Sequence, residues 1–188
     1  MTASENTLAS GKFFRFWSAA NEPRAVVLIS HGLGEHSGRY EHVAAALTAD
    51  NLDVYAPDHI GHGKSPGKPA YIDRFSDLTS GVSELRDHIR RHHAGLPVIL
   101  IGHSMGGLIA IRLALGAHAD YAGLILTGPL LGLPDTPSRL QVMLLRVLSV
   151  LAPTIKATEI DASAVSRDPA VVSDYIADPL VHHDNIPA

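Results

Sequence analysis

The chain has 188 residues, of which 46% are hydrophobic, and a formal net charge of −4. This length supports one domain with a sizeable core, and the charges do not form the clustered basic face of a nucleic-acid-binding protein. Cysteine is absent, so disulfides, thiol catalysis and cysteine–zinc sites are excluded. Residues 1–11 lack the apolar stretch of a signal peptide, and no apolar run reaches the roughly 18 residues of a transmembrane helix, so we expect a cytoplasmic protein.

Short apolar runs alternate with helical patterns from the N-terminus onward. Residues 12–17 are rich in aromatic side chains and indicate an edge strand. Residues 25–30 and 52–56 predict buried strands, with an alanine-rich helix over residues 40–50 between them. Residues 75–93 carry apolar side chains at spacings of four, three and four, which predicts an amphipathic helix.

The same alternation continues with a strand over residues 98–101, a helix over residues 105–117 and a strand over residues 123–127. This helix contains only one charged residue, Arg112, and we therefore expect the helix to be buried. Short apolar strands that alternate with helices predict an α/β fold with a doubly wound, mostly parallel sheet. Ligands of such sheets bind beyond the carboxyl ends of the strands.

The alternation stops after Pro134. Residues 138–151 form an apolar helical pattern, and residues 168–177 predict a second helix with a proline in its first turn. No strand is predicted between them. We expect an insertion over the edge of the sheet, which divides the chain into residues 1–133 and residues 134–188.

The most specific motif is G-x-S-x-G at residues 102–106, between a predicted strand and a predicted helix. This is the setting of a nucleophile elbow, a sharp turn that exposes a serine hydroxyl at a helix N-terminus. The helix dipole at that position favours negative charge. The turn requires small residues two positions before and after the serine, and here they are Gly102 and Gly106. Ser104 is therefore the candidate nucleophile.

Three loop motifs accompany the elbow, at residues 31–40, 58–65 and 178–182. Together the four motifs resemble the monoacylglycerol lipase and lysophospholipase-like branch of the α/β-hydrolases, over nearly the whole chain. The resemblance implies an α/β-hydrolase core, of which residues 1–133 form the N-terminal part, and a helical cap, which residues 134–188 include incompletely. It implies hydrolysis of one acyl ester of a glycerolipid through an acyl-enzyme, without cofactor or metal. It also implies an oxyanion hole formed by the backbone N–H groups of Leu33 and Met105, and membrane contact through the cap.

The remaining triad members do not match any position of this sequence. In the family they follow strands beyond the cap, so the resemblance implies that this chain is the N-terminal portion of a lipase and is inactive alone. His182, His183 and Asp184 fall at cap positions and are not expected to act as base and acid. Asp58 precedes the serine, against the chain order of this fold. We expect Asp58 to hold residues 61–65 through an Asx-type turn.

The chain contains 12 histidines, four of which follow the first two predicted core strands. We expect these four to bond loop backbone rather than a metal, because they lack carboxylate or thiolate partners at ligand spacing. They are His31, His36, His59 and His62. His103, next to the elbow serine, is expected to be structural.

Several alternatives remain open. A short-chain carboxylesterase, a thioesterase and a peptidase share the same elbow, and a non-catalytic fragment that binds lipid is a different class of function. The helix over residues 138–151 fits either ordinary packing or a lid that contacts lipid. Without further strands, residues 123–127 are expected to form an open apolar edge through which the chain associates.

Overall fold

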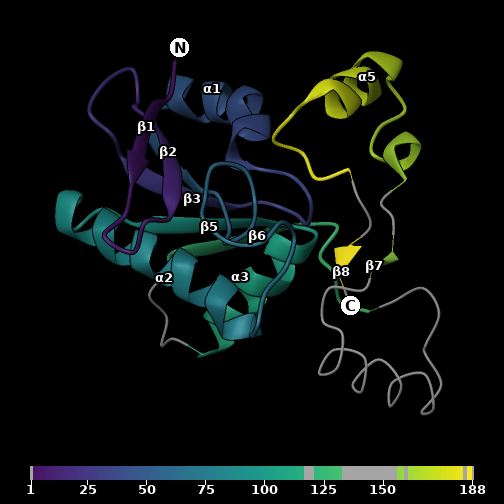
Figure 1. The fold of residues 1–188 in the computed structure, drawn as a ribbon. Coiled ribbons are helices and arrows are strands. Elements are labelled where there is room, and N and C mark those ends of the chain that lie inside the picture. Colours follow the sequence, from purple (N-terminus) through teal and green to yellow (C-terminus); the bar gives the residue numbers. More distant parts are fainter. Residues whose placement is uncertain (1, 117–120, 133–155, 159–160, 184–185, 188) are drawn as a thin grey trace.

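The computed structural model has a six-stranded sheet in the order β1–β2–β4–β3–β5–β6, with helices on both faces (Figure 1). β1 and β2 are antiparallel to their neighbours, and the other strands are parallel. The predicted α/β fold with a mostly parallel sheet is confirmed. The structure describes residues 2–116, 121–132, 156–158, 161–183 and 186–187.

The strands agree with the sequence pattern except at the N-terminal edge. β2 is not the edge strand that its aromatic residues indicated, because β1 pairs with its outer side and places Ser4 opposite Phe16. β1 is exposed along its length and carries no apolar alternation, so the sequence gives no strand signal there. The strands are β1 (Ser4–Thr7), β2 (Phe13–Trp17), β3 (Ala25–Ser30), β4 (Leu52–Pro57), β5 (Val98–His103) and β6 (Gly123–Thr127).

The two faces of the sheet are covered by different helices, as Figure 1 shows. α2 (Phe75–His92) and α3 (Met105–Gly116) pack on the face that receives Val26 and Leu28 of β3. α1 (Glu41–Ala49), which follows the short helix η1 (Ser37–Tyr40), packs on the opposite face. Because successive side chains of a strand point to opposite faces, a continuous apolar strand such as β3 is required between two helical layers.

The helices confirm one burial prediction and correct another. The predicted stripe of α2 is buried: Leu78, Val82, Leu85 and Ile89 are each at most 3% exposed. α3 is buried mainly over its first turns and again at Leu113, whereas Arg112 and residues 114–116 are exposed, so the expectation of a buried helix holds only in part. No helix within the described ranges is long and apolar enough to cross a membrane.

β6 ends the sheet of the described residues, and β5 is its only strand partner there. Leu124 and Ile125 are 39% and 49% exposed, so the strand is much less buried than its apolar sequence predicts. The expectation of an open apolar edge at residues 123–127 agrees with this geometry. Association through that edge stays a prediction.

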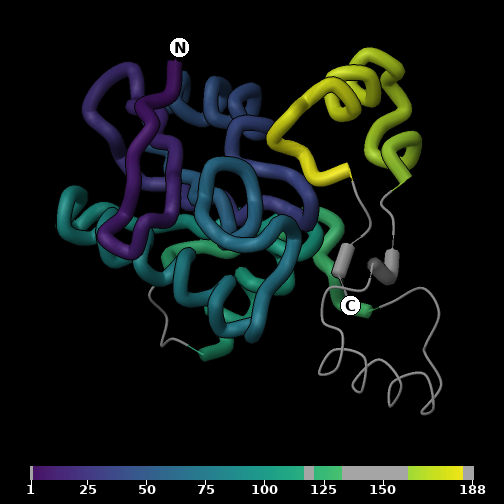
Figure 2. The backbone as a smooth tube through the Cα atoms, viewed as in Figure 1, coloured from purple at the N-terminus to yellow at the C-terminus, as the bar shows by residue number. Residues whose placement is uncertain are grey.

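The later segment includes a two-stranded pairing that the sequence analysis did not predict, between β7 (Lys156–Thr158) and β8 (Ile186–Pro187). The short helix η2 (Ala162–Ala164) and α5 (Pro169–Ala177) lie between them in the chain, and α5 begins where its proline predicted. After α5 the chain returns to the loop that follows β3 (Figure 2). The predicted helix over residues 138–151 and the predicted boundary at residues 133–134 lie outside the described residues.

Candidate active site

Ser104 occupies the turn between β5 and α3 with a φ angle of 51°, a strained value for a residue with a side chain. The glycines around it are required by close packing. A Cβ atom on Gly102 would lie 2.5 Å from the carbonyl oxygen of Gly106, and one on Gly106 would lie 2.0 Å from that of Ser30. The strand–turn–helix arrangement predicted from the motif is therefore present, with the serine at its tip.

Backbone hydrogen bonds hold this turn in place. The N–H of Ser104 donates to the carbonyl oxygen of Thr127 at 3.1 Å, and the carbonyl oxygen of Ser104 accepts from Gly107, Leu108 and Leu130. The side chain of Ser104 is half-buried, and its hydroxyl has no hydrogen-bond partner among the described residues. A rigid backbone thus presents a free hydroxyl at the carboxyl end of β5.

His103 does not face the serine hydroxyl as a base would. Its Nδ1 lies 2.9 Å from Oγ1 and 3.0 Å from the carbonyl oxygen of Thr127, so the ring ties the end of β5 to β6. This agrees with the structural role expected for His103.

The loop after β3 lies directly against the elbow. A Cβ atom on Gly32 would be 3.3 Å from the Cβ atom of Ser104. Leu33 follows, and its N–H has no acceptor among the described residues. Met105 is the first residue of α3, so its N–H has no acceptor within the helix. Two unused donors therefore flank the serine on neighbouring segments.

Glu35 holds this loop, a role that the sequence analysis did not assign. Its Oε1 accepts from the N–H of Gly32 at 2.6 Å and from the hydroxyl of Tyr40 at 2.7 Å. Burial and the carboxylate of Glu35 raise the pKa of Tyr40, so this hydroxyl remains a donor. Glu35 and Tyr40 both lie inside the motif at residues 31–40, but no periodic pattern in the sequence indicates that their side chains bond each other.

Three of the four histidines beside the elbow bond loop backbone through their rings, as expected: His31, His36 and His62. The ring of His59 differs, because its Nε2 lies 3.1 Å from Oγ of Ser30 on β3. His31 donates from Nδ1 to the carbonyl oxygen of Gly32 at 2.7 Å and accepts at Nε2 from the N–H of His59 at 3.0 Å, which fixes a neutral ring. Burial lowers the pKa of His31, of His59 and of His62, the last to about 4. Nε2 of His62 is buried without a partner. Within the described part of the chain, no three ligating side chains are grouped so as to hold a metal ion.

Asp58 is fully buried and connects two loops. Its Oδ1 accepts from the N–H and the hydroxyl of Ser37, and its Oδ2 accepts from the N–H of Lys64 at 2.8 Å. The expected Asx-type turn is wrong, because the bonded N–H lies six residues along the chain rather than two. A guanidinium nitrogen of Arg15, 3.6 Å away, provides the compensating charge. Asp58 is therefore structural.

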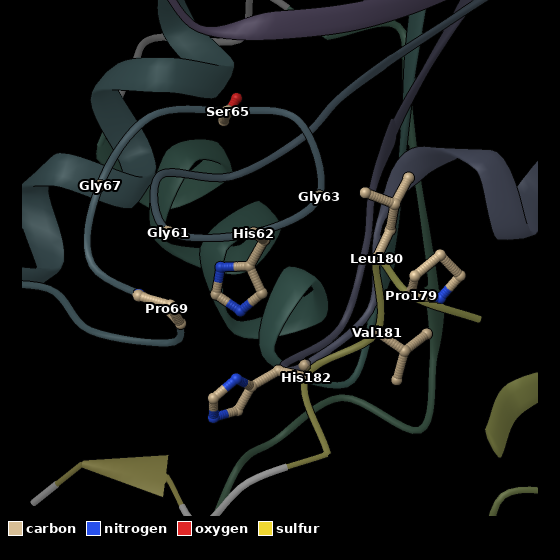
Figure 3. Close-up of a pocket in the computed structure, with 11 residues that line it drawn as sticks. Gly61, His62, Gly63, Ser65, Gly67, Pro69, Pro179, Leu180, Val181 and His182 are labelled. Carbon is tan, nitrogen blue, oxygen red and sulfur yellow. The ribbon is translucent and has the colours of Figure 1, made fainter. Parts of the chain in front are cut away.

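Residues 178–182, which we call the strap, run from the end of α5 to the loop after β3. Nε2 of His36 lies 2.8 Å from Oδ2 of Asp178, and the N–H of His182 donates to the carbonyl oxygen of Gly34 at 2.8 Å. A cavity of about 220 Å³ separates the strap from the glycine-rich loop over residues 61–69 (Figure 3). His182 ends the strap and His183 follows it, with Nε2 of His183 3.1 Å from the carbonyl oxygen of Asp178; Asp184 lies outside the described residues.

Comparisons with known proteins agree with this geometry. Residues 21–188 match the family described as serine aminopeptidase, S33. A monoacylglycerol lipase of Mycolicibacterium smegmatis is 42% identical over 172 residues, which cover 92% of this chain and 61% of the relative. The human monoglyceride lipase is 39% identical over 170 residues, which cover 90% of this chain and 56% of the relative.

Among solved structures, the monoacylglycerol lipase of Paleococcus ferrophilus is 33% identical and matches with a TM-score of 0.78, covering 100% of this chain and 66% of that one. A soluble variant of the monoglyceride lipase of Saccharomyces cerevisiae, in complex with a substrate analogue, is 26% identical and matches with a TM-score of 0.75. The match covers 100% of this chain and 64% of that one. The chain spans about 60% of the length of the curated relatives above. It belongs to the serine aminopeptidase S33 family and, within the α/β-hydrolases, to the monoacylglycerol lipase-like branch.

Proposed function

We propose that Ser104 is the nucleophile of an ester hydrolase that cleaves the acyl ester of monoacylglycerols or lysophospholipid-like lipids through an acyl-enzyme. The observation that carries this proposal is the strained Ser104 between β5 and α3, with the loop of Leu33 against its side chain. The names of the relatives, monoacylglycerol lipase and monoglyceride lipase, support the substrate class.

In the proposed reaction, Oγ of Ser104 attacks the ester carbonyl carbon while a general base takes the hydroxyl proton. The tetrahedral oxyanion receives hydrogen bonds from the N–H groups of Leu33 and Met105. Loss of one such donor costs about 2.7–4 kcal/mol of transition-state stabilisation. The intermediate collapses with release of the alcohol, which takes the proton from the base, and water then hydrolyses the acyl-enzyme by the same steps. The reaction needs neither metal nor cofactor.

The base and its acid partner are proposed to lie outside the described residues. No histidine of the described ranges bonds the hydroxyl of Ser104, and a serine without its base loses most of its reactivity. We also propose that the cap, divided from the core near residue 134, contacts the lipid surface that supplies the substrate.

The proposal is tested with two polypeptides. One is residues 1–188, and the other is the same chain extended at its C-terminus with the portion of the M. smegmatis lipase beyond the matched segment. Release of fatty acid from 2-monooleoylglycerol is measured for both, with Ser104→Ala variants. We expect the extended chain to hydrolyse this substrate and residues 1–188 not to do so. Ser104→Ala should abolish hydrolysis by the extended chain.

Three results would contradict the proposal. Hydrolysis that survives Ser104→Ala would exclude this nucleophile. A folded extended chain that cleaves peptide or short-chain ester substrates but no monoacylglycerol would overturn the substrate class. Ser104-dependent hydrolysis by residues 1–188 alone would contradict the expectation that the added C-terminal portion supplies the base.

A further inference from the structure

We propose that Asp178 is a positioning residue for the oxyanion hole: it holds His36, and through His36 the loop that carries Leu33. The strap and this loop would then behave as one unit, which links the segment after α5 to the reacting centre. This inference rests on the proposed function, because Leu33 matters only if its N–H stabilises an oxyanion.

The direction of the contact follows from the hydrogen bonds of His36. Its Nδ1 accepts from the N–H of Gly38 at 3.1 Å, so in the neutral ring the proton is on Nε2. Nε2 therefore donates to Oδ2 of Asp178 at 2.8 Å. His36 is 5% exposed, so water does not replace this bond easily.

Asp178 is itself held as a charged acceptor. Its Oδ1 accepts from the N–H of Leu180 at 2.9 Å. Partial burial raises the pKa of Asp178, but the bonds from His36 and Leu180 outweigh it and leave the pKa below its usual range. A charged acceptor forms the stronger kind of hydrogen bond, which suits a contact that fixes a loop.

A second contact anchors the strap on the same loop. The N–H of His182 donates to the carbonyl oxygen of Gly34 at 2.8 Å, next to Leu33 in the chain. On the other side of Leu33, the N–H of Gly32 is held by Glu35. Leu33 thus lies between restrained neighbours, while its own N–H remains unused among the described residues.

Between its two anchors the strap borders a cavity, and of its side chains that of Val181 is buried, at 5% exposed. Figure 3 shows Pro179, Leu180 and Val181 on one side of this cavity and the loop of Gly61 and Gly63 on the other. The open volume of about 220 Å³ leaves room for the strap to shift. Loss of the bond between His36 and Asp178 would therefore let the strap move away from the loop over residues 32–38 and leave that loop less restrained.

The test compares Asp178→Ala, Asp178→Asn and a control, Asp174→Ala, at an exposed position on α5, the helix that ends directly before Asp178. Asparagine keeps a side-chain oxygen that accepts from His36. Hydrogen–deuterium exchange of residues 32–38 is measured in the 188-residue chain, and kcat and KM for 2-monooleoylglycerol in the extended polypeptide.

We expect Asp178→Ala to speed exchange in residues 32–38 and to lower kcat on the order of tenfold, with KM little changed. Asp178→Asn should restore most of both, and Asp174→Ala should alter neither. Unchanged exchange and kcat in Asp178→Ala would overturn the inference, and so would equal defects in Asp178→Ala and Asp178→Asn. If Asp178→Ala speeds exchange but the unmodified extended chain shows no Ser104-dependent hydrolysis, the contact is real and the proposed function fails.

Discussion

Lowering the pH from 7.5 to 5 is expected to destabilise the folded chain, because histidines next to the elbow are buried in their neutral form. His62 has the clearest effect: burial, with a smaller contribution from neighbouring His31, lowers its pKa from 6.5 to about 4. Below pH 6.5 the unfolded chain binds a proton at this residue, and the folded chain does not bind it until the pH nears 4. The stability contributed by the neutral ring is therefore complete above pH 6.5 and is lost as the pH falls towards 4.

The size of the effect follows from the shift. One pKa unit corresponds to about 1.4 kcal/mol, so His62 alone should remove about 2 kcal/mol of the unfolding free energy at pH 5 and about 3 kcal/mol near pH 4. His31 and His59 act in the same direction, because burial lowers the pKa of each. This loss is a large part of the total stability of a typical domain.

The measurement is urea unfolding at several pH values, followed by the fluorescence of Trp17, the single tryptophan, which is 1% exposed. In His62→Asn the amide can replace Nδ1 as donor to the carbonyl oxygen of Ile60. We expect this variant to lose about 2 kcal/mol of the pH dependence between pH 7.5 and 5. His42→Asn, at an exposed position on α1, should keep all of it. Equal pH dependence in His62→Asn and the unmodified chain would refute the reasoning.

Three substitutions test the packing around the site by urea unfolding. Gly106→Ala forces a Cβ atom against a backbone carbonyl of β3 and should lower the free energy of unfolding by about 3 kcal/mol. A Cβ atom on Gly116 meets nothing within 4 Å, so the control Gly116→Ala should not destabilise the chain. Equal unfolding midpoints for the two variants would contradict this. Asp58→Ala removes the buried acceptor of Ser37 and Lys64. It also leaves the Arg15 guanidinium with only the more exposed Glu5 as an ion-pair partner among the described residues, and it should cost on the order of 3–5 kcal/mol. A loss below about 1 kcal/mol would count against a structural role. Tyr40→Phe removes the bond to Glu35 and should cost about 1 kcal/mol, and no loss would indicate that this bond is unimportant.

Local patterns predicted much of the core. The spacing of apolar residues predicted α2, and the glycines two positions before and after Ser104 predicted the elbow. Both patterns depend only on residues close together in the sequence. β1 was missed because it is short, polar and exposed, so only its pairing with β2 defines it as a strand. The exposure of β6 could not be read from its apolar sequence, since burial depends on what lies beside a strand.

The supports of the site were harder to predict. Asp58 bonds Ser37 and Lys64, and Asp178 bonds His36, 142 residues away in the chain. Contacts between loops of this kind have no periodicity, so their partners appear only when the fold brings the loops together. The histidines near the elbow were nevertheless expected to serve loop backbone, and His31 does so, whereas the ring of His59 bonds the hydroxyl of Ser30.

Covalent labelling of Ser104 tests the central claim most directly. The extended polypeptide is treated with a fluorophosphonate, its intact mass is measured, and the modified residue is located by peptide mapping, with Ser104→Ala as the control. We expect one adduct per chain, located at Ser104 and absent from the variant. A folded polypeptide that forms no adduct, or an adduct that persists in Ser104→Ala, would contradict the assignment of Ser104 as the nucleophile.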